Sequence, residues 1–286
     1  MSEPEEIEIE TPVGRVAARA WGPPDGVAVL AVHGWLDSAA SFDHIAPNMP
    51  GLRIVAIDLP GHGYSEHRPA GTLYPFLDHV AAVYEVAEAL GWSTLCLLGH
   101  SLGAAVCSIF AGTFPTRVTR LGLIEGLGPL SEHPKHAPER LAKSLVEHTE
   151  KRAKRPGVHA TREVAHRRLL ATPSKLAAAS VDTLLTRALL EVDGGVTWRS
   201  DPALRIASRS RLTENQVLAF LSAIACPTLL IRGDTGYSFV PEVASARVAA
   251  VDGMRVVQLA GGHHLHLDNP APVAAALNEL FADLVS

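Results

Sequence analysis

The sequence predicts an α/β protein built on a mostly parallel sheet, and three observations support this. Continuous apolar runs, typical of strands that are buried on both faces, recur along the chain. Segments with helical periodicity lie between these runs, so strands and helices alternate. The alternation is interrupted once, over residues 126–225. We therefore expect right-handed crossovers that cover both faces of one sheet with helices, and an insertion between two of its strands.

The expected strands are short and bounded by turn residues. Residues 6–10 alternate apolar and charged side chains, as an edge strand does, and the turn at 11–14 leads into a second strand at 15–21. Further strands are expected at 27–32, 54–57, 94–98, 118–124, 228–231 and 255–259, which makes eight in all. Helices are expected at about 38–47, 75–90 and 102–114, from about 241, and from about 270 to 284.

Residues 126–225 differ from the rest in composition. They are rich in Arg, Ala, Leu and His, and no strand-like run is apparent among them. We expect a helical cap domain here, with residues 1–125 and 226–286 forming the core domain. The segment has 16 Lys and Arg against 10 Asp and Glu, whereas the whole chain has a net charge of −5. This excess of basic residues fits solvated amphipathic helices, or a cationic cover that attracts anionic substrates.

Composition excludes several classes of protein. Of the 286 residues 47% are apolar and 19% are charged, as in a globular protein with a large core. The acidic balance argues against nucleic-acid binding. The first ten residues lack the basic and apolar regions of a signal peptide, and no apolar run is long enough to span a membrane. Cys96, Cys107 and Cys226 lie in apolar stretches, as reduced core residues do. We expect a cytoplasmic protein.

The strongest catalytic signal is the pentapeptide Gly99-His100-Ser101-Leu102-Gly103, which matches G-x-S-x-G. It follows an expected strand and begins an expected helix, which is the context of a nucleophile elbow. The glycines are required because this turn is strained and neighbouring backbone passes close to it. The pattern predicts that Ser101 is a nucleophile at the carboxyl end of a strand.

A serine hydroxyl needs a base, and histidines gather late in the chain. His263, His264 and His266 follow the strand at 255–259, and Asp268 comes next. Such a group could hold a metal, but zinc-binding helices favour His pairs four residues apart with a further ligand elsewhere, and no such set stands out. We expect no metal and no cofactor.

Together these motifs resemble the α/β-hydrolase-fold enzymes over nearly the whole chain. His33-Gly34-Trp35 resembles the oxyanion motif of that family, and residues 58–65 resemble its D-x-x-G-x-G-x-S stretch. Within the fold, residues 33–43 and 233–239 are most similar to the serine hydrolase-like proteins. The resemblance implies a mostly parallel eight-stranded sheet flanked by helices, with a cap insertion.

The resemblance also implies which histidine is the base. The family has the form G-H-x-x-H-x-x-x-P, and counting back from Pro270 gives His263. His264 is the alternative, because register in a loop can shift by one residue. His266 corresponds to the second His of the form, and we expect it to pack or to hydrogen-bond.

The acid of the triad departs from the commoner family pattern. Many members carry an Asp three residues after a Gly, in the loop that follows the strand at 228–231. Here position 236, three residues after Gly233, is Gly. Asp234 is an alternative acid, but it lies two positions early.

The other location known in the family is the end of the strand after the nucleophile's helix. Glu125 lies there, 24 residues after Ser101. A carboxylate at the end of an apolar strand needs a partner, and His263 would be one. We therefore expect Glu125 to be the acid.

The implied function is that of a cofactor-free serine hydrolase acting on a small-molecule ester, thioester or related acyl substrate. The backbone N–H groups of Trp35 and Leu102 are the expected oxyanion hole. Ser101 argues against dehalogenases and epoxide hydrolases of this fold, which use an Asp nucleophile. A carbon–carbon bond hydrolase, a cofactor-independent oxygenase and a small-molecule-binding protein without hydrolytic activity remain alternatives.

Overall fold

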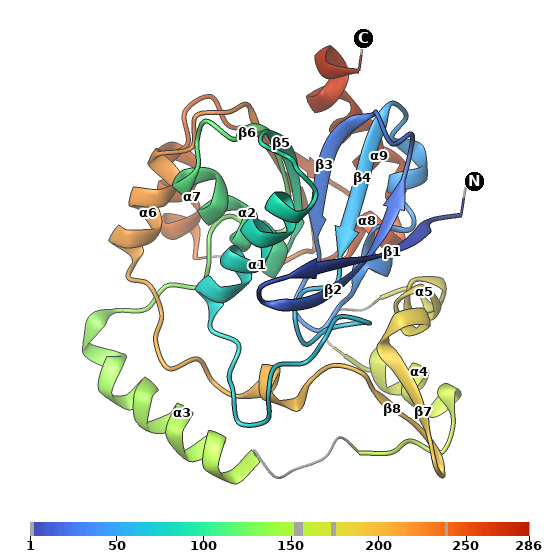
Figure 1. Ribbon diagram of the computed structural model, residues 1–286. Coiled ribbons are helices and arrows are strands. Elements are labelled where there is room, and N and C mark those ends of the chain that lie inside the picture. Colours follow the sequence, from blue (N-terminus) through green and yellow to red (C-terminus); the bar gives the residue numbers. More distant parts are fainter. Residues whose placement is uncertain (1–2, 152–156, 173–175, 238–239, 286) are drawn as a thin grey trace.

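An eight-stranded sheet runs through the centre of the molecule (Figure 1), in the computed structural model that describes residues 3–151, 157–172, 176–237 and 240–285. Its strand order is β1-β2-β4-β3-β5-β6-β9-β10. The strands are β1 (Glu5–Thr11), β2 (Gly14–Trp21), β3 (Val27–Val32), β4 (Leu52–Ile57), β5 (Leu95–His100), β6 (Val118–Ile124), β9 (Thr228–Gly233) and β10 (Arg255–Leu259). Only the pairings of β1 with β2 and of β2 with β4 are antiparallel within this sheet. The expected fold class is confirmed.

Alternating side chains of the central strands pack on opposite faces of the sheet. In β3, Leu30 and Val32 join a cluster with helices α1 (Phe76–Ala89) and α2 (Leu102–Thr113). Val29 and Ala31 face the other way and pack with α9 (Pro270–Phe281). Because both faces are covered, these strands consist of continuous apolar runs, which is why they could be predicted from the sequence.

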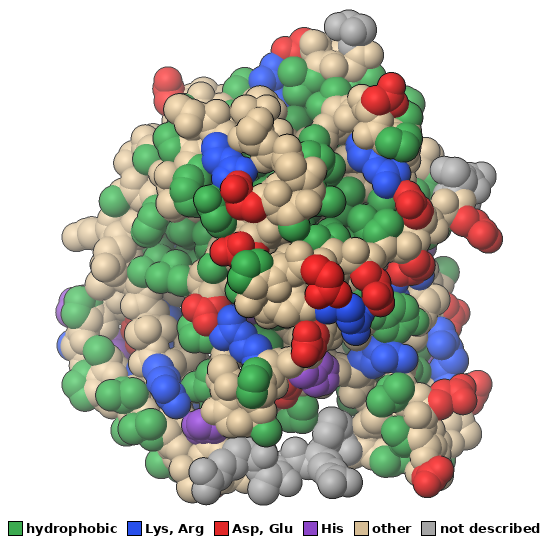
Figure 2. Space-filling view, viewed as in Figure 1, with side chains coloured by type: hydrophobic (Ala, Val, Ile, Leu, Met, Phe, Trp, Pro, Cys, Tyr) green, Lys and Arg blue, Asp and Glu red, His purple; other side chains and the backbone are tan. Residues whose placement is uncertain are grey.

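The edge strand β1 carries charged side chains, as the alternation of its sequence predicts. Ion pairs join Arg15 to Glu8 and Arg19 to Glu6 across the β1–β2 pair. Figure 2 shows acidic and basic side chains interspersed over this face of the molecule. Charged side chains on an edge strand hinder its pairing with other chains.

The prediction of one helix at 38–47 was wrong. The chain instead forms two short 3₁₀ helices, η1 (Ala39–Phe42) and η2 (Ala46–Asn48). The N–H group of Ala39 donates to Asp58 Oδ1 at 2.7 Å, which fixes the entry to η1, and Pro47 lacks the N–H group that a longer helix needs. The other expected helices formed, with α7 at Pro241–Ala250 and with α9 followed by a 3₁₀ turn, η5 (Ala282–Leu284).

Residues 126–225 contribute no strand to the main sheet within their described part. They form the helices α3 (Ala137–Lys151), α4 (Arg162–Leu170), α5 (Ala178–Ala188) and α6 (Glu214–Ser222). Figure 1 shows α3, α4 and α5 at one end of the sheet. The helix α6 packs against α2 and α7 instead, so this end of the segment lies against the core.

A hairpin within this segment was not predicted. The strands β7 (Leu189–Val192) and β8 (Gly195–Trp198) pair with each other and form a separate two-stranded sheet. Asp193 and Gly194 form the turn, and Gly194 and the first residue of β8, Gly195, have φ angles of 85° and 143°. Each strand has four residues, and the first continues directly from α5, so no separate apolar run marks it.

The three cysteines are buried and free, as expected. Across the residues that the structure describes, we find no helix with the length and apolar character that crossing a membrane requires.

A buried arginine joins the inserted segment to the core. The guanidinium of Arg187, on α5, is fully buried and donates to Asp58 Oδ2 from Nη2 at 2.6 Å and from Nε at 3.1 Å. It also pairs with Glu6 on β1, and it lies 4.2 Å from the ring centre of Tyr64. Asp58 follows β4 directly, so the two ion pairs of Arg187 connect three parts of the chain.

We expect Arg187→Ala to lower the free energy of unfolding by about 3–5 kcal/mol, because Asp58 would remain buried without its counter-ion. Urea unfolding at neutral pH measures the change. The matched control is Arg255→Ala, which removes the exposed pair with Glu279 and should cost at most about 1 kcal/mol. Equal losses in the two variants would contradict this prediction.

Candidate active site

Ser101 lies in a strained turn between β5 and α2. Its φ and ψ angles are 51° and −111°, a conformation that L residues rarely adopt. A Cβ atom on Gly99 would lie 2.5 Å from Gly103 O, and one on Gly103 would lie 1.9 Å from Val32 O. The two glycines therefore allow strand, turn and helix to approach closely, and the turn presents the Ser101 hydroxyl at the end of the strand.

The structure brings Ser101, His263 and Glu125 together. The Nε2 atom of His263 lies 2.9 Å from Ser101 Oγ, and its Nδ1 atom lies 3.2 Å from Glu125 Oε2. A carboxylate only accepts hydrogen bonds, so the imidazole carries its proton on Nδ1. The lone pair of Nε2 then faces the serine hydroxyl, as a general base requires.

The Glu125 carboxylate is enclosed by the loop that follows β9. Its Oε1 atom accepts the N–H of Gly233 at 2.7 Å, and Oε2 accepts the N–H of Tyr237 at 2.6 Å. A Cβ atom on Gly236 would lie 2.2 Å from Oε2, so only glycine fits there. Burial raises the pKa of Glu125, but the hydrogen bonds from His263, Tyr237 and Gly233 outweigh it and lower the pKa. The carboxylate is therefore ionised at neutral pH.

Asp234, the alternative acid, has another partner. Its Oδ1 atom accepts the N–H of Gly261 at 2.9 Å, and its own N–H donates to Leu259 O. It makes no hydrogen bond to His263 within the part of the chain that the structure describes. Asp234 instead connects the loop after β9 to the loop that carries His263. The last residues of the segment 233–239, at positions 238 and 239, lie outside the described residues.

The loop after β3 lies beside the serine turn. Its residue Leu36 has a φ angle of 65°, and the imidazole of His33 donates to Gly34 O and accepts the N–H of Leu59. Neither the N–H of Trp35 nor that of Leu102 has a hydrogen-bond partner among the described residues. The indole of Trp35 donates to Leu204 O at 3.1 Å, which holds this loop against the inserted segment.

The other late histidines face away from the serine. The Nε2 atom of His264 lies 3.3 Å from Asp37 Oδ2, and that of His266 lies 2.8 Å from Ser41 Oγ. Asp268 accepts hydrogen bonds from Ser180 and from the N–H of Ala177. The structure therefore places His263 against Ser101. The rings of His263, His264 and His266 each contact the ring of His100, with centroids 4.9, 4.9 and 4.1 Å away.

Sequence reasoning missed a buried group formed by Asp37, His100 and His264. The ligand-type atoms of these side chains all lie within 4.8 Å of one another. Although burial raises the pKa of Asp37, the two histidines lower it well below its usual range. Burial lowers the pKa of His100 to about 4, whereas Asp37 outweighs burial at His264 and raises its pKa. The three residues are far apart in the chain, so no spacing pattern could reveal the group.

A cavity of about 230 Å³ lies between the loop after β3 and the inserted segment. Apolar side chains and two arginines line much of it, and Ser101 is not among its lining residues. The lining residues are Leu36, Asp37, Gly63, Arg168, Leu169, Thr172, Leu184, Ala188, Trp198, Ser200 and Arg205. The cavity is thus built by both the core and the inserted segment.

Comparisons with known proteins agree with this architecture. Residues 27–270 match the family described as the alpha/beta hydrolase fold. A serine hydrolase-like protein of Danio rerio is 31% identical, over 96% of this chain and 87% of its own length. A second one, from Dictyostelium discoideum, is 32% identical over 93% of this chain and 78% of its own length.

Two solved structures are also similar over almost the full chain. A hypothetical protein of Pseudomonas aeruginosa is 40% identical with a TM-score of 0.91, covering 98% of this chain and 99% of its own. The thioesterase domain from the curacin biosynthetic pathway is 30% identical with a TM-score of 0.83, covering 98% of this chain and 100% of its own.

Proposed function

The chain belongs to the alpha/beta hydrolase fold family, and from that premise we propose that it is a serine hydrolase of carboxylic esters, thioesters or related acyl compounds. One observation carries the proposal: the continuous path of hydrogen bonds from Glu125 through His263 to Ser101. This is the arrangement by which a serine hydroxyl becomes a nucleophile.

The first half-reaction forms an acyl-enzyme. Ser101 Oγ attacks the substrate carbonyl carbon while its proton passes to His263 Nε2. Glu125 stabilises the imidazolium that results, because its carboxylate already accepts the hydrogen bond that the Nδ1–H group of His263 donates. The C–O or C–S bond to the leaving group then breaks, and the leaving group takes the proton from Nε2. In the second half-reaction a water molecule attacks the acyl carbon and gives its proton to His263 Nε2. The bond from that carbon to Ser101 Oγ then breaks, Oγ takes the proton back, and the carboxylic acid product leaves.

Negative charge develops on the carbonyl oxygen in both half-reactions. The N–H groups of Trp35 and Leu102 are the donors we assign to it, since neither has a partner among the described residues. One such donor is typically worth about 3–4 kcal/mol of barrier. The Trp35 indole bond to Leu204 orients the loop that supplies the first donor.

The inserted segment acts as a cap in this proposal and selects the substrate. Support comes from the cavity, which α4, α5, β8 and the 3₁₀ turn η4 (Pro202–Arg205) line together with Leu36 and Asp37. The similar curacin domain is a thioesterase, which supports the inclusion of thioesters among candidate substrates.

We expect a fluorophosphonate probe to label the protein at Ser101, because only an activated serine reacts with it. Peptide mapping by mass spectrometry locates the adduct. Ser101→Ala should abolish both labelling and ester hydrolysis, whereas Ser93→Ala, at an exposed serine, should change neither. An unlabelled wild-type protein would contradict the proposal and favour a binding protein without hydrolytic activity.

We expect Glu125→Gln to lower kcat by about 10⁴-fold with little change in KM, because the acid acts on the imidazolium in the transition state. Asp234→Asn is the control, since the amide oxygen of Asn can still accept the Gly261 N–H. Steady-state kinetics on a soluble ester measures both variants. A larger kcat loss in Asp234→Asn than in Glu125→Gln would exclude Glu125 as the acid.

Arg168 and Arg205 predict an anionic group on the substrate. Both residues line the cavity, and neither side chain forms an ion pair within the described residues. We expect Arg205→Gln to lower kcat/KM about 10-fold or more for an ester with a carboxylate on its acyl chain, and to leave a neutral ester of equal length unaffected. Arg209→Gln, an exposed arginine that does not line the cavity, is the control. Equal effects on both esters would contradict this prediction.

A further inference from the structure

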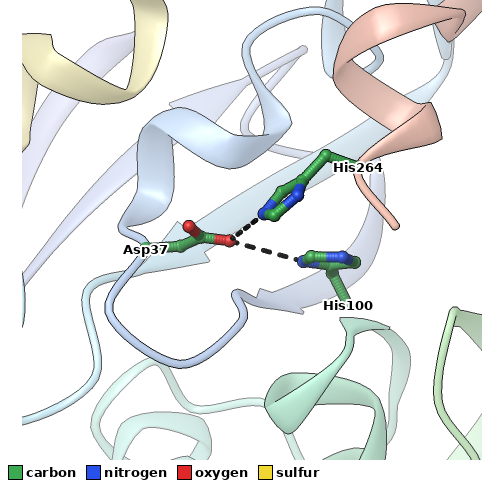
Figure 3. A group of neighbouring side chains, drawn as sticks. All are labelled: Asp37, His100 and His264. Atoms are coloured by element: carbon green, nitrogen blue, oxygen red, sulfur yellow. Dashed lines mark hydrogen bonds and ion pairs between the residues drawn. The ribbon is translucent and has the colours of Figure 1, made fainter. Parts of the chain in front are cut away.

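We propose that Asp37, His100 and His264 form a binding site for Zn²⁺ next to the candidate active site. Figure 3 shows the three side chains converging from three separate segments of the chain. Asp37 lies in the loop after β3, His100 ends β5, and His264 precedes the short helix α8 (Leu265–Asp268). Two imidazoles and a carboxylate form a donor set that zinc prefers.

The spacing of the donor atoms fits a single ion. Asp37 Oδ2 lies 3.5 Å from His100 Nδ1 and 3.3 Å from His264 Nε2. Tetrahedral zinc with bonds of about 2.0–2.2 Å separates its ligand atoms by roughly 3.3–3.6 Å. The donor atoms of the two histidines lie within 4.8 Å of each other. An ion between the three side chains would therefore need the two imidazoles to move slightly closer together.

The orientation of the His100 ring supplies a second, independent observation. Its Nε2 atom lies 2.8 Å from His263 O, and a carbonyl only accepts, so the proton of the neutral ring is on Nε2. The lone pair of Nδ1 then faces the carboxylate oxygen of Asp37. The His100 side chain is only 1% exposed, and Nδ1 makes no hydrogen bond with the described residues. A cation between the two atoms would satisfy both of them.

The hydrogen bond from His100 Nε2 to His263 O has the form usual in zinc sites. A metal-binding histidine commonly donates its other ring N–H to a backbone carbonyl or carboxylate, which fixes the tautomer and the ring orientation. His100 has this arrangement before any metal is added. His264, in contrast, has no hydrogen-bond partner for Nδ1 among the described residues.

The site also has room for an ion and a route by which the ion can reach it. A Cβ atom on Gly34 would lie 2.9 Å from both Asp37 Oδ2 and His100 Nδ1, so glycine keeps the region between them open. Asp37 also lines the cavity described above, which gives an ion a route from solvent. The fourth position of a tetrahedral ion is then left for a water molecule.

A bound ion would join the three segments that carry the candidate catalytic groups. Asp37 is two residues from Trp35, His100 adjoins Ser101, and His264 adjoins His263. We therefore expect Zn²⁺ to stabilise the folded protein and raise its Tm, because an ion that binds only the folded state stabilises that state.

Isothermal titration of the full-length protein with Zn²⁺, after chelator treatment and dialysis, tests the site. We expect one equivalent to bind and the Tm to rise. Asp37→Asn and His264→Gln should each weaken binding by about 10-fold or more. His136→Gln, at an exposed histidine distant in sequence from the group, is the matched control and should bind as the wild type does.

X-ray absorption of the zinc-loaded wild type provides a readout that does not depend on how the variants fold. Two imidazole ligands and additional oxygen ligands support the site. Absent binding, binding that both variants retain in full, or a spectrum without two imidazoles would overturn it, and Asp37 and His264 would then be a simple buried ion pair. Because no substrate is used, either result leaves the hydrolase proposal to be tested separately by probe labelling.

Discussion

The candidate site depends on the burial of one carboxylate, that of Glu125. Removing an ionised carboxyl from water is costly unless hydrogen bonds replace those it loses. Three donors do so here: the N–H groups of Gly233 and Tyr237, and the imidazole of His263. The same three bonds fix the loop after β9 and the orientation of the imidazole. The position of the His263 imidazole relative to Ser101 is thus a consequence of satisfying a buried charge.

Backbone strain is concentrated around the same point. Within the described residues, the non-glycine residues with positive φ are Leu36, Ser101 and Glu125. They lie in the loop that carries the expected oxyanion donor, at the expected nucleophile and at the expected acid. Each such conformation costs of order 1–3 kcal/mol and persists only where the surrounding structure over-determines it. The buried strands β3, β5 and β6, which end just before these residues, provide that support.

The sequence predicted what depends on local pattern and on burial. The strands of the central sheet are continuous apolar runs because both faces are covered, and the turn at Ser101 requires glycines that are visible as a motif. The hairpin at 189–198 was missed because its strands are short and continue directly from a helix. The group of Asp37, His100 and His264 was missed for another reason. Its members meet only through the order of strands in the sheet, which no spacing along the chain encodes.

The position of Glu125 follows from the same order of strands. In the sheet β6 lies next to β9, with Ile124 opposite Ile231, and the N–H of Glu125 donates to Ile231 O. Carboxyl ends of neighbouring parallel strands lie side by side, so an acid at the end of either one can reach the same imidazole. With the Glu125 carboxylate directly after β6, the chain at the end of β9 and in the loop after it provides the backbone donors Gly233 and Tyr237. Position 236 must then be glycine, because a side chain there would occupy the space of the Glu125 carboxylate. The position of the Glu125 carboxylate therefore depends on a glycine at position 236.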